Sequence, residues 1–133
     1  MTDEQCNAAI ADASPAIAAF ITYFNAGDWE KCGSIYNQDA VMNPIGSGVP
    51  VTRGREACAQ VWKAVIGDMG CKNIHQWDKK YTVIDEANVL YTAKWVMNKI
   101  SGTIHSEHWR KINGTWELIY DVFEVEAKFF HEG

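Results

Sequence analysis

The sequence NAGDW at residues 25–29 opens the stretch that decides the fold of this chain. The stretch continues through MNPIGS at residues 42–47 and ends with RG at residues 53–54. Asn and Gly favour the end of one helix, and Asp28 is a good N-cap for a second, short helix. Proline and glycine then interrupt a strand, because both residues are strong turn signals. The predicted order is helix end, short helix, strand, turn, strand and the start of a third helix.

Apolar residues recur at helical spacing on both sides of this stretch. Ser14 and Pro15 have the composition of a helix N-cap followed by proline at the first helical position. The positions that follow at i, i+3, i+4 and i+7 form one apolar face: Ile17, Phe20, Ile21 and Phe24. A third helix is predicted over 54–66, with a buried side made of Cys58, Val61, Trp62 and Val65.

The second half of the chain changes to a strand pattern. From residue 71 to 126 it is rich in β-branched and aromatic residues, interrupted by turn signals at 85–88, 101–102 and 113–114. Four long antiparallel strands are predicted, at 71–84, 88–100, 103–112 and 115–126. Helices followed by a run of hairpins predict an α+β fold, in which three N-terminal helices pack against a curved antiparallel sheet. We expect residues 1–133 to form one domain.

Composition narrows the range of partners. The net charge is −5 and the pI is about 5.3, which disfavours binding to nucleic acid or to an anionic membrane, since both need clustered Lys and Arg. The four cysteines have no metal-binding spacing, and the acidic N-terminus is unlike a signal peptide. Free thiols and a cytoplasmic location are expected. No cofactor and no metal site are predicted.

The stretch at 25–54 closely resembles the corresponding part of ketosteroid isomerase, and the element order resembles that of the nuclear-transport-factor-2-like (NTF2-like), or SnoaL-like, superfamily. This resemblance implies a cone-shaped sheet that encloses an apolar pocket. Family members include isomerases, polyketide cyclases, dehydratases, transport factors and kinase association domains. Fold alone therefore does not name the reaction.

The resemblance also argues against steroid isomerase chemistry. The family's proton-transferring aspartate matches Asn43, whose amide carries no accepting charge at neutral pH. The tyrosine that donates to the oxyanion matches Phe20, while a supporting tyrosine matches Tyr36 and another matches Trp62. Asn43 is expected to face the mouth of the pocket and to orient a substrate oxygen.

Other polar residues are candidates for acid–base catalysis. Glu107 and His108 lie in a polar segment, and alternation along a strand requires one of them to face inward unless a bulge intervenes. Without a bulge, His105, Glu107 and Trp109 share a face. Asp121 lies in the last strand, where some SnoaL-like cyclases have an acid–base aspartate. The alternative is that these side chains lie on the solvent face, because charged residues are rarely buried.

Aromatic residues are the predicted ligand-binding surface. His75 is included because it precedes Trp77 and Tyr81 at strand spacing. The full predicted set is Phe20, Phe24, Tyr36, Trp62, His75, Trp95 and Trp109.

Two functions remain open. The first is a cofactor-independent isomerase, cyclase or dehydratase that acts on a small hydrophobic molecule. The second is a non-catalytic ligand-binding or self-association module. Apolar residues on both faces of the strands also predict a homodimer that forms through the outer face of the sheet.

Overall fold

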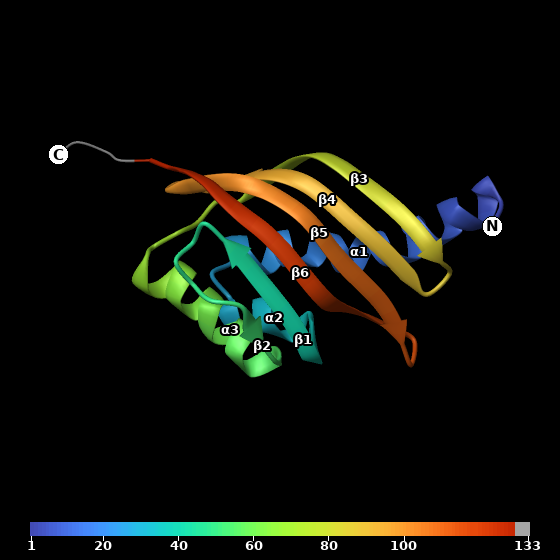
Figure 1. Cartoon of the computed structure of the whole chain (residues 1–133), viewed down its shortest axis with the longest axis horizontal. Helices are drawn as coiled ribbons and strands as arrows, with labels where there is room; N and C mark the ends of the chain where they lie inside the picture. Colours follow the sequence, from blue (N-terminus) through green and yellow to red (C-terminus); the bar gives the residue numbers. More distant parts are fainter. Residues whose placement is uncertain (130–133) are drawn as a thin grey trace.

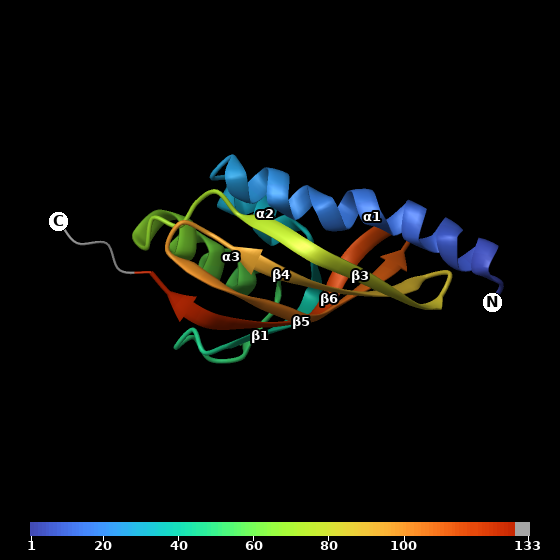
Figure 2. The ribbon, with the colours of Figure 1, turned by 90° about the horizontal axis from the view of Figure 1, so that it is seen from above.

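Residues 1–129, which the computed structural model describes, form a layer of helices on one side of a curved six-stranded sheet (Figures 1 and 2). The helices are α1 (Asp3–Asn25), α2 (Trp29–Ser34) and α3 (Arg55–Lys63), and α3 continues into a π-helical turn, η1 (Ala64–Asp68). The strands are β1 (Tyr36–Ile45), β2 (Thr52–Arg53), β3 (His75–Asp85), β4 (Asn88–Val96), β5 (Ile100–Ile112) and β6 (Thr115–Lys128). The predicted α+β class, with helices against a curved sheet, is confirmed.

The first helix begins earlier than the sequence predicted. Thr2 is its N-cap: the Thr2 hydroxyl accepts from the Gln5 amide at 3.1 Å, and the Gln5 side chain accepts from the Thr2 amide at 2.8 Å. This reciprocal capping box satisfies two backbone N–H groups that a helix start leaves free. Pro15 therefore lies inside α1. The predicted helix start at Ser14 and Pro15 is wrong. Proline lacks a backbone N–H, but the loss of that one hydrogen bond does not interrupt a helix that is already capped at Thr2.

The sheet is mixed, with strand order β2-β1-β6-β5-β4-β3. β1 runs parallel to β6, with Val41 opposite Tyr120 and Ile45 opposite Glu124, whereas the other pairs are antiparallel. The expectation of an entirely antiparallel sheet is corrected at this one pair. β1 also continues through Pro44, because β2 pairs only as far as Met42 and the missing proline N–H then costs no ladder bond on that side.

Bulges bend the long strands and change which side chains face inward. Asp78 has a φ of 54°, and β3 gains one residue over β4 between Trp77 and Lys80. A second irregularity lies between Ile104 and Ser106 on β5. An extra residue reverses the in–out alternation beyond it. Ile104 and Glu107 are therefore both buried although they are three positions apart.

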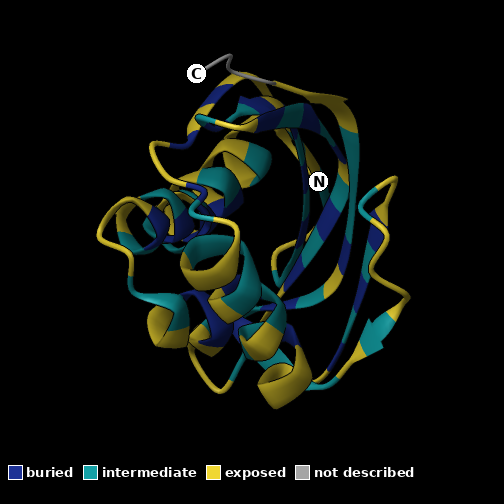
Figure 3. Cartoon of the chain, turned by 90° about the vertical axis from the view of Figure 1, so that its left-hand side faces the viewer, coloured by how far each residue is buried: buried dark blue, intermediate teal, exposed yellow. Residues whose placement is uncertain are grey.

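The core lies between the helices and the concave side of the sheet, where the buried segments of both layers face one another (Figure 3). Phe24 packs edge-on against Trp62 of α3, with ring centroids 6.1 Å apart, and Phe20 lies at 4.9 Å from the same ring. Trp62 in turn stacks on Phe123 of β6 at 5.8 Å. This aromatic column joins α1, α3 and the sheet, as the helical periodicity around Phe20 predicted.

We expect Gly102→Ala to destabilise the protein by roughly 1–3 kcal/mol, the usual cost of overpacking. A methyl group on Gly102 would lie 1.7 Å from the Glu124 carbonyl oxygen and 2.7 Å from the Trp95 ring. Urea unfolding measures the change. Gly67→Ala is the control, because a methyl group there meets nothing within 4 Å. Equal stability of the two variants would contradict the close packing of β5 between Trp95 and β6.

Candidate functional site

A cavity of about 100 Å³ lies between the helical layer and the concave face of the sheet. Its walls are mostly apolar, formed by side chains such as Phe20, Trp62, Trp95, Ile104 and Phe123. Its buried polar side chains are Tyr36, Gln76, Glu107 and Asp121, from β1, β3, β5 and β6, and the lining also includes Ser47 and Lys128. An apolar enclosure with a few convergent polar groups is the usual form of a small-molecule site.

Two carboxyl groups lie in this cavity on neighbouring strands. Glu107 of β5 is the cross-strand partner of Asp121 of β6, and their exposed fractions are 9% and 3%. Burial raises the pKa of Glu107 well above its usual range, and the charge of Asp121 raises it further. Burial also raises the pKa of Asp121 to about 7. Burial therefore favours the protonated form of Glu107, while Asp121 titrates near neutral pH.

A chain of hydrogen bonds holds Asp121. The Tyr36 hydroxyl donates to Asp121 Oδ2 at 2.8 Å and accepts from the Trp62 indole N–H at 3.1 Å. The Tyr36 bond favours the charged form of Asp121 and partly offsets its burial. The other oxygen, Oδ1, is buried and has no partner within residues 1–129. Asp121 thus has one oxygen that accepts a hydrogen bond and one buried oxygen without a partner among the described residues.

Glu107 has its own anchor. The Trp109 indole N–H donates to Glu107 Oε1 at 2.8 Å. Trp109 is fully buried two positions further along β5. Its hydrogen bond opposes the effect of burial on the Glu107 pKa, although burial dominates. Glu107 therefore accepts directly from an indole, whereas Asp121 accepts from a phenol that itself accepts from the Trp62 indole.

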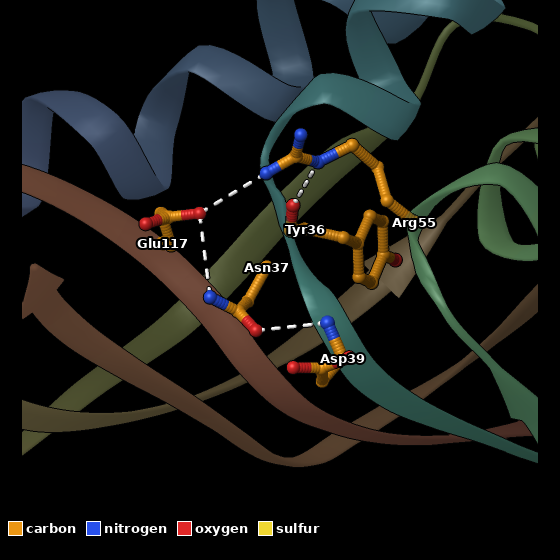
Figure 4. Close-up of polar contacts among 5 residues, drawn as sticks. All are labelled: Tyr36, Asn37, Asp39, Arg55 and Glu117. Carbon is orange, nitrogen blue, oxygen red and sulfur yellow. Dashed lines mark hydrogen bonds and ion pairs between the residues drawn. The ribbon is translucent and has the colours of Figure 1, made fainter.

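Arg55 fixes the strand that carries Tyr36 (Figure 4). Its Nε donates to the Tyr36 carbonyl oxygen at 2.7 Å, and its guanidinium pairs with Glu117 of β6 at 3.2 Å. Asn37 lies beside this pair, and its side-chain oxygen accepts from the Asp39 amide at 2.9 Å. Because these contacts join β1, α3 and β6, they set the position from which the Tyr36 ring extends to Asp121.

The structure brings together six of the predicted site residues. Glu107, Asp121, Phe20, Tyr36, Trp62 and Trp95 all line the cavity. Phe24 and Trp109 are buried directly behind the wall, where Phe24 supports Trp62 and Trp109 holds Glu107.

Three other predicted site residues lie elsewhere. His108 follows Glu107 on the opposite face of β5, where its ring nitrogen bonds the Asn88 side chain at 2.9 Å and burial lowers its pKa. Asn43 is half-buried outside the cavity wall, while its neighbours Met42 and Pro44 are buried. It therefore does not face the pocket mouth as predicted. His75 is exposed and stacks on Trp77 at 5.8 Å.

The bulge in β3 explains why His75 was misplaced and why one cavity residue was missed by sequence reasoning. If side chains alternated strictly along β3, without the extra residue near Asp78, then His75, Trp77 and Tyr81 would lie on one face. In the structure His75 and Trp77 are exposed, whereas Gln76 is buried, lines the cavity and accepts from the Tyr91 hydroxyl at 2.6 Å. His105 is likewise outside, paired with Glu124 at 2.8 Å. An Asp at positive φ has no distinct sequence signal, so Gln76 could not be found.

Comparison with solved structures identifies the fold. A type 2 hexachlorocyclohexane dehydrochlorinase (LinA) superposes with a TM-score of 0.78 at 12% identity, over 99% of this chain and 95% of that one. A candidate scytalone dehydratase from Novosphingobium aromaticivorans gives 0.75 at 12% identity, over 99% and 94%. A ketosteroid isomerase-like protein from Erwinia carotovora atroseptica gives 0.73 at 17% identity, over 89% and 96%. No family model and no curated protein sequence matches the chain.

These likenesses confirm the predicted NTF2-like fold. At 12–17% identity they are likenesses of fold, and the chemistry must be argued from the cavity itself. Within residues 1–129 no helix is long and apolar enough to cross a membrane, and no three His, Cys, Asp or Glu side chains gather as metal ligands would.

We expect the Asp121 carboxyl to titrate near pH 7 and the Glu107 carboxyl to stay protonated there, as followed by ¹³C NMR of labelled protein. Because the folded pKa of Asp121 is raised, its contribution to stability is full below the unfolded pKa and is lost as the pH rises through about 7. The loss between pH 4 and pH 8 is on the order of 4 kcal/mol, at about 1.4 kcal/mol per pKa unit.

Chemical unfolding at a series of pH values measures this dependence. Asp121→Asn should remove the Asp121 share of this dependence, because an amide does not titrate, while the buried Glu107, whose pKa is also raised, accounts for the dependence that remains. Glu126→Gln changes an exposed carboxylate on the same strand and is the control. An Asp121 resonance that titrates near pH 4 in the folded protein would contradict the assignment.

Proposed function

We propose that this protein is a cofactor-independent enzyme that transfers a proton on a small hydrophobic molecule, in the class of isomerases, cyclases and dehydratases. The observation that carries the proposal is the pair of buried carboxyls, Glu107 and Asp121, on one wall of an apolar cavity. Burying two carboxyls costs stability unless they are compensated. Raised pKa values in a cavity are therefore a reason to expect function.

The two carboxyls are suited to opposite roles. Asp121, with a pKa of about 7, is ionised in a large fraction of molecules at neutral pH and accepts the proton through its free Oδ1. Glu107 is neutral and holds a proton that it can donate to the reacting molecule. A pair of titratable groups with separated pKa values is the usual arrangement of an acid and a base in one site.

Tyr36 and Trp62 are positioning residues in this proposal. The Tyr36 hydroxyl occupies Asp121 Oδ2 and so leaves Oδ1 to face the substrate. The Trp62 N–H fixes the direction of the Tyr36 hydroxyl, because a donor to the hydroxyl oxygen on one side leaves the O–H proton to point toward Asp121 on the other.

The cavity also supports the distinction from true ketosteroid isomerases. Phe20 lines the wall at the position that the resemblance matches to the oxyanion donor, and a phenyl ring has no proton to donate. Asn43 lies outside the wall. Proton transfer here would use carboxyls on β5 and β6 instead.

The test measures exchange of carbon-bound protons in D₂O by ¹H NMR, with cyclohexanone and 2-tetralone as probes. We expect exchange with at least one probe above the buffer rate, and a rate that increases with pH through about 7 as Asp121 ionises. Asp121→Asn should lower the rate by about 10²–10⁴, the usual contribution of a general base. Glu107→Gln should lower it less, and Glu126→Gln should leave it unchanged. A rate that is unaffected by Asp121→Asn would contradict the proposal.

We further propose that two copies associate through the outer face of the sheet. Across the strands, Val41 of β1, Tyr120 of β6, His108 of β5 and Leu90 of β4 are successive partners on this face. Tyr120 is 44% exposed and Trp77, on β3, is 45% exposed. Exposed aromatic residues over a continuous sheet surface are typical of association sites.

Light scattering at micromolar concentration should give the mass of a dimer, about twice 14.9 kDa for association of two copies. Tyr120→Glu should shift the mass to that of a monomer, because a charge would be buried without a partner. Val51→Glu, at an exposed apolar residue between β1 and β2, is the control. A wild-type monomer would overturn the association.

A reducing, cytoplasmic location fits the cysteines. Cys32, Cys58 and Cys71 are buried thiols, and burial raises the pKa of Cys32 to about 12 and that of Cys58 to about 11. Thiols with such pKa values are inert and structural.

A further inference from the structure

Two buried polar atoms in the cavity walls have no hydrogen-bond partner within residues 1–129. They are the indole N–H of Trp95 and Oδ1 of Asp121. Both residues line the same cavity and are 3% exposed. One atom is a donor and the other, in the carboxylate form, is an acceptor. The cavity therefore lacks one partner of each kind.

The Trp95 N–H is an exception among the buried indoles of this protein. Trp62 donates to Tyr36, Trp109 to Glu107, and Trp116 to Asp12 at 2.8 Å. An unpaired buried donor costs about 1–3 kcal/mol, so native proteins rarely keep one without a reason. The Phe123 ring lies edge-on to Trp95 with centroids 6.4 Å apart, and an aromatic face is only a weak substitute for an oxygen acceptor.

Trp95 and Asp121 lie at different levels along the sheet. Trp95 pairs with Gly102, which pairs with Val125 of β6, so Trp95 is level with a position four residues beyond Asp121. At about 3.3 Å per residue, this places the two backbone positions roughly 13 Å apart along the strand direction. Phe123 lies between them on β6 and also lines the cavity. An apolar, cavity-lining side chain thus lies at a level between the two residues that carry the donor and the acceptor.

The Trp95 ring is held in place by its surroundings. Gly102 has no side chain, and the ring lies directly over it, at the position where a methyl group would come within 2.7 Å. A ring packed this closely cannot turn to find another acceptor without moving β5. The direction of its N–H is therefore preset.

We propose that Trp95 is the specificity-determining residue of this cavity, and that the substrate is a two-ended molecule. One end carries the proton that faces Asp121 Oδ1, the apolar middle packs on Phe123, and the other end presents an oxygen that accepts from the Trp95 N–H. A ketone, ester or ether oxygen fulfils this last requirement, whereas a pure hydrocarbon does not. This inference rests on the proposed function, since it assigns the substrate class of the same site.

The test compares two probes of the same shape, 4-hydroxyacetophenone and 4-isopropylphenol. Both carry a phenol proton and an apolar ring, but only the first has an oxygen acceptor at its other end. Binding is followed by isothermal titration and by the indole ¹H–¹⁵N resonances of labelled protein. We expect 4-hydroxyacetophenone to bind about tenfold more tightly, the value of one well-made hydrogen bond. It alone should shift the Trp95 indole proton downfield.

Trp95→Phe keeps an aromatic ring and removes the N–H. It should remove the tenfold preference while 4-isopropylphenol still binds, and that retained binding reports an intact cavity. Trp116→Phe is the matched control, because its indole bonds Asp12 away from the cavity. Equal binding of both probes to the wild type, failure of both to bind at millimolar concentration, or a preference that survives in Trp95→Phe would each overturn the inference. The proposed function is judged separately, by proton exchange and its dependence on Asp121.

Discussion

The burial of two carboxyl groups beside one apolar cavity is the constraint on which the rest of the site depends. Water no longer solvates Glu107 and Asp121, and each repels charge on the other, so neither can be held without support from nearby donors. Trp109 supports one, and Tyr36 with Trp62 supports the other. Arg55 then fixes the backbone of Tyr36. The aromatic residues around the cavity thus act as hydrogen-bond donors as well as apolar walls.

The two carboxyls accept from different donors, and their pKa values differ. Asp121 accepts from a phenol, which partly restores its charged form, and its pKa stays near neutrality. Glu107 is also repelled by Asp121, and its pKa rises further. One protein wall therefore presents a group able to take up a proton next to a group able to give one. Because both side chains are carboxyl groups, the difference between their pKa values arises from their hydrogen bonds and from their mutual repulsion.

Much of the fold could be predicted from local chemistry. Apolar spacing around Phe20 located the inner face of α1, Asp28 capped α2 as expected, and alternation correctly required one of Glu107 and His108 to face inward. The misses have different causes: strict alternation does not record a bulge, whereas the capping box of Thr2 and Gln5 is a local signal that the interpretation of Ser14 and Pro15 overlooked. The bulge at Asp78 turned His75 outward and Gln76 inward, and the Thr2 capping box extended α1 through Pro15. The parallel pairing of β1 with β6 is a tertiary outcome, since the two strands are far apart in sequence.

That pairing has a consequence for how the protein folds. Tyr36 and Asp121, which form the central hydrogen bond of the site, are 85 residues apart in the chain. Loop closure over such a distance is entropically costly, and folds rich in non-local pairs fold slowly. β6 is the last of the six strands of this sheet in chain order, yet it lies in the middle of the sheet between β1 and β5. Until β6 is synthesised, β1 and β5 therefore each have an unpaired edge. The cavity forms only when β6 inserts between these two strands.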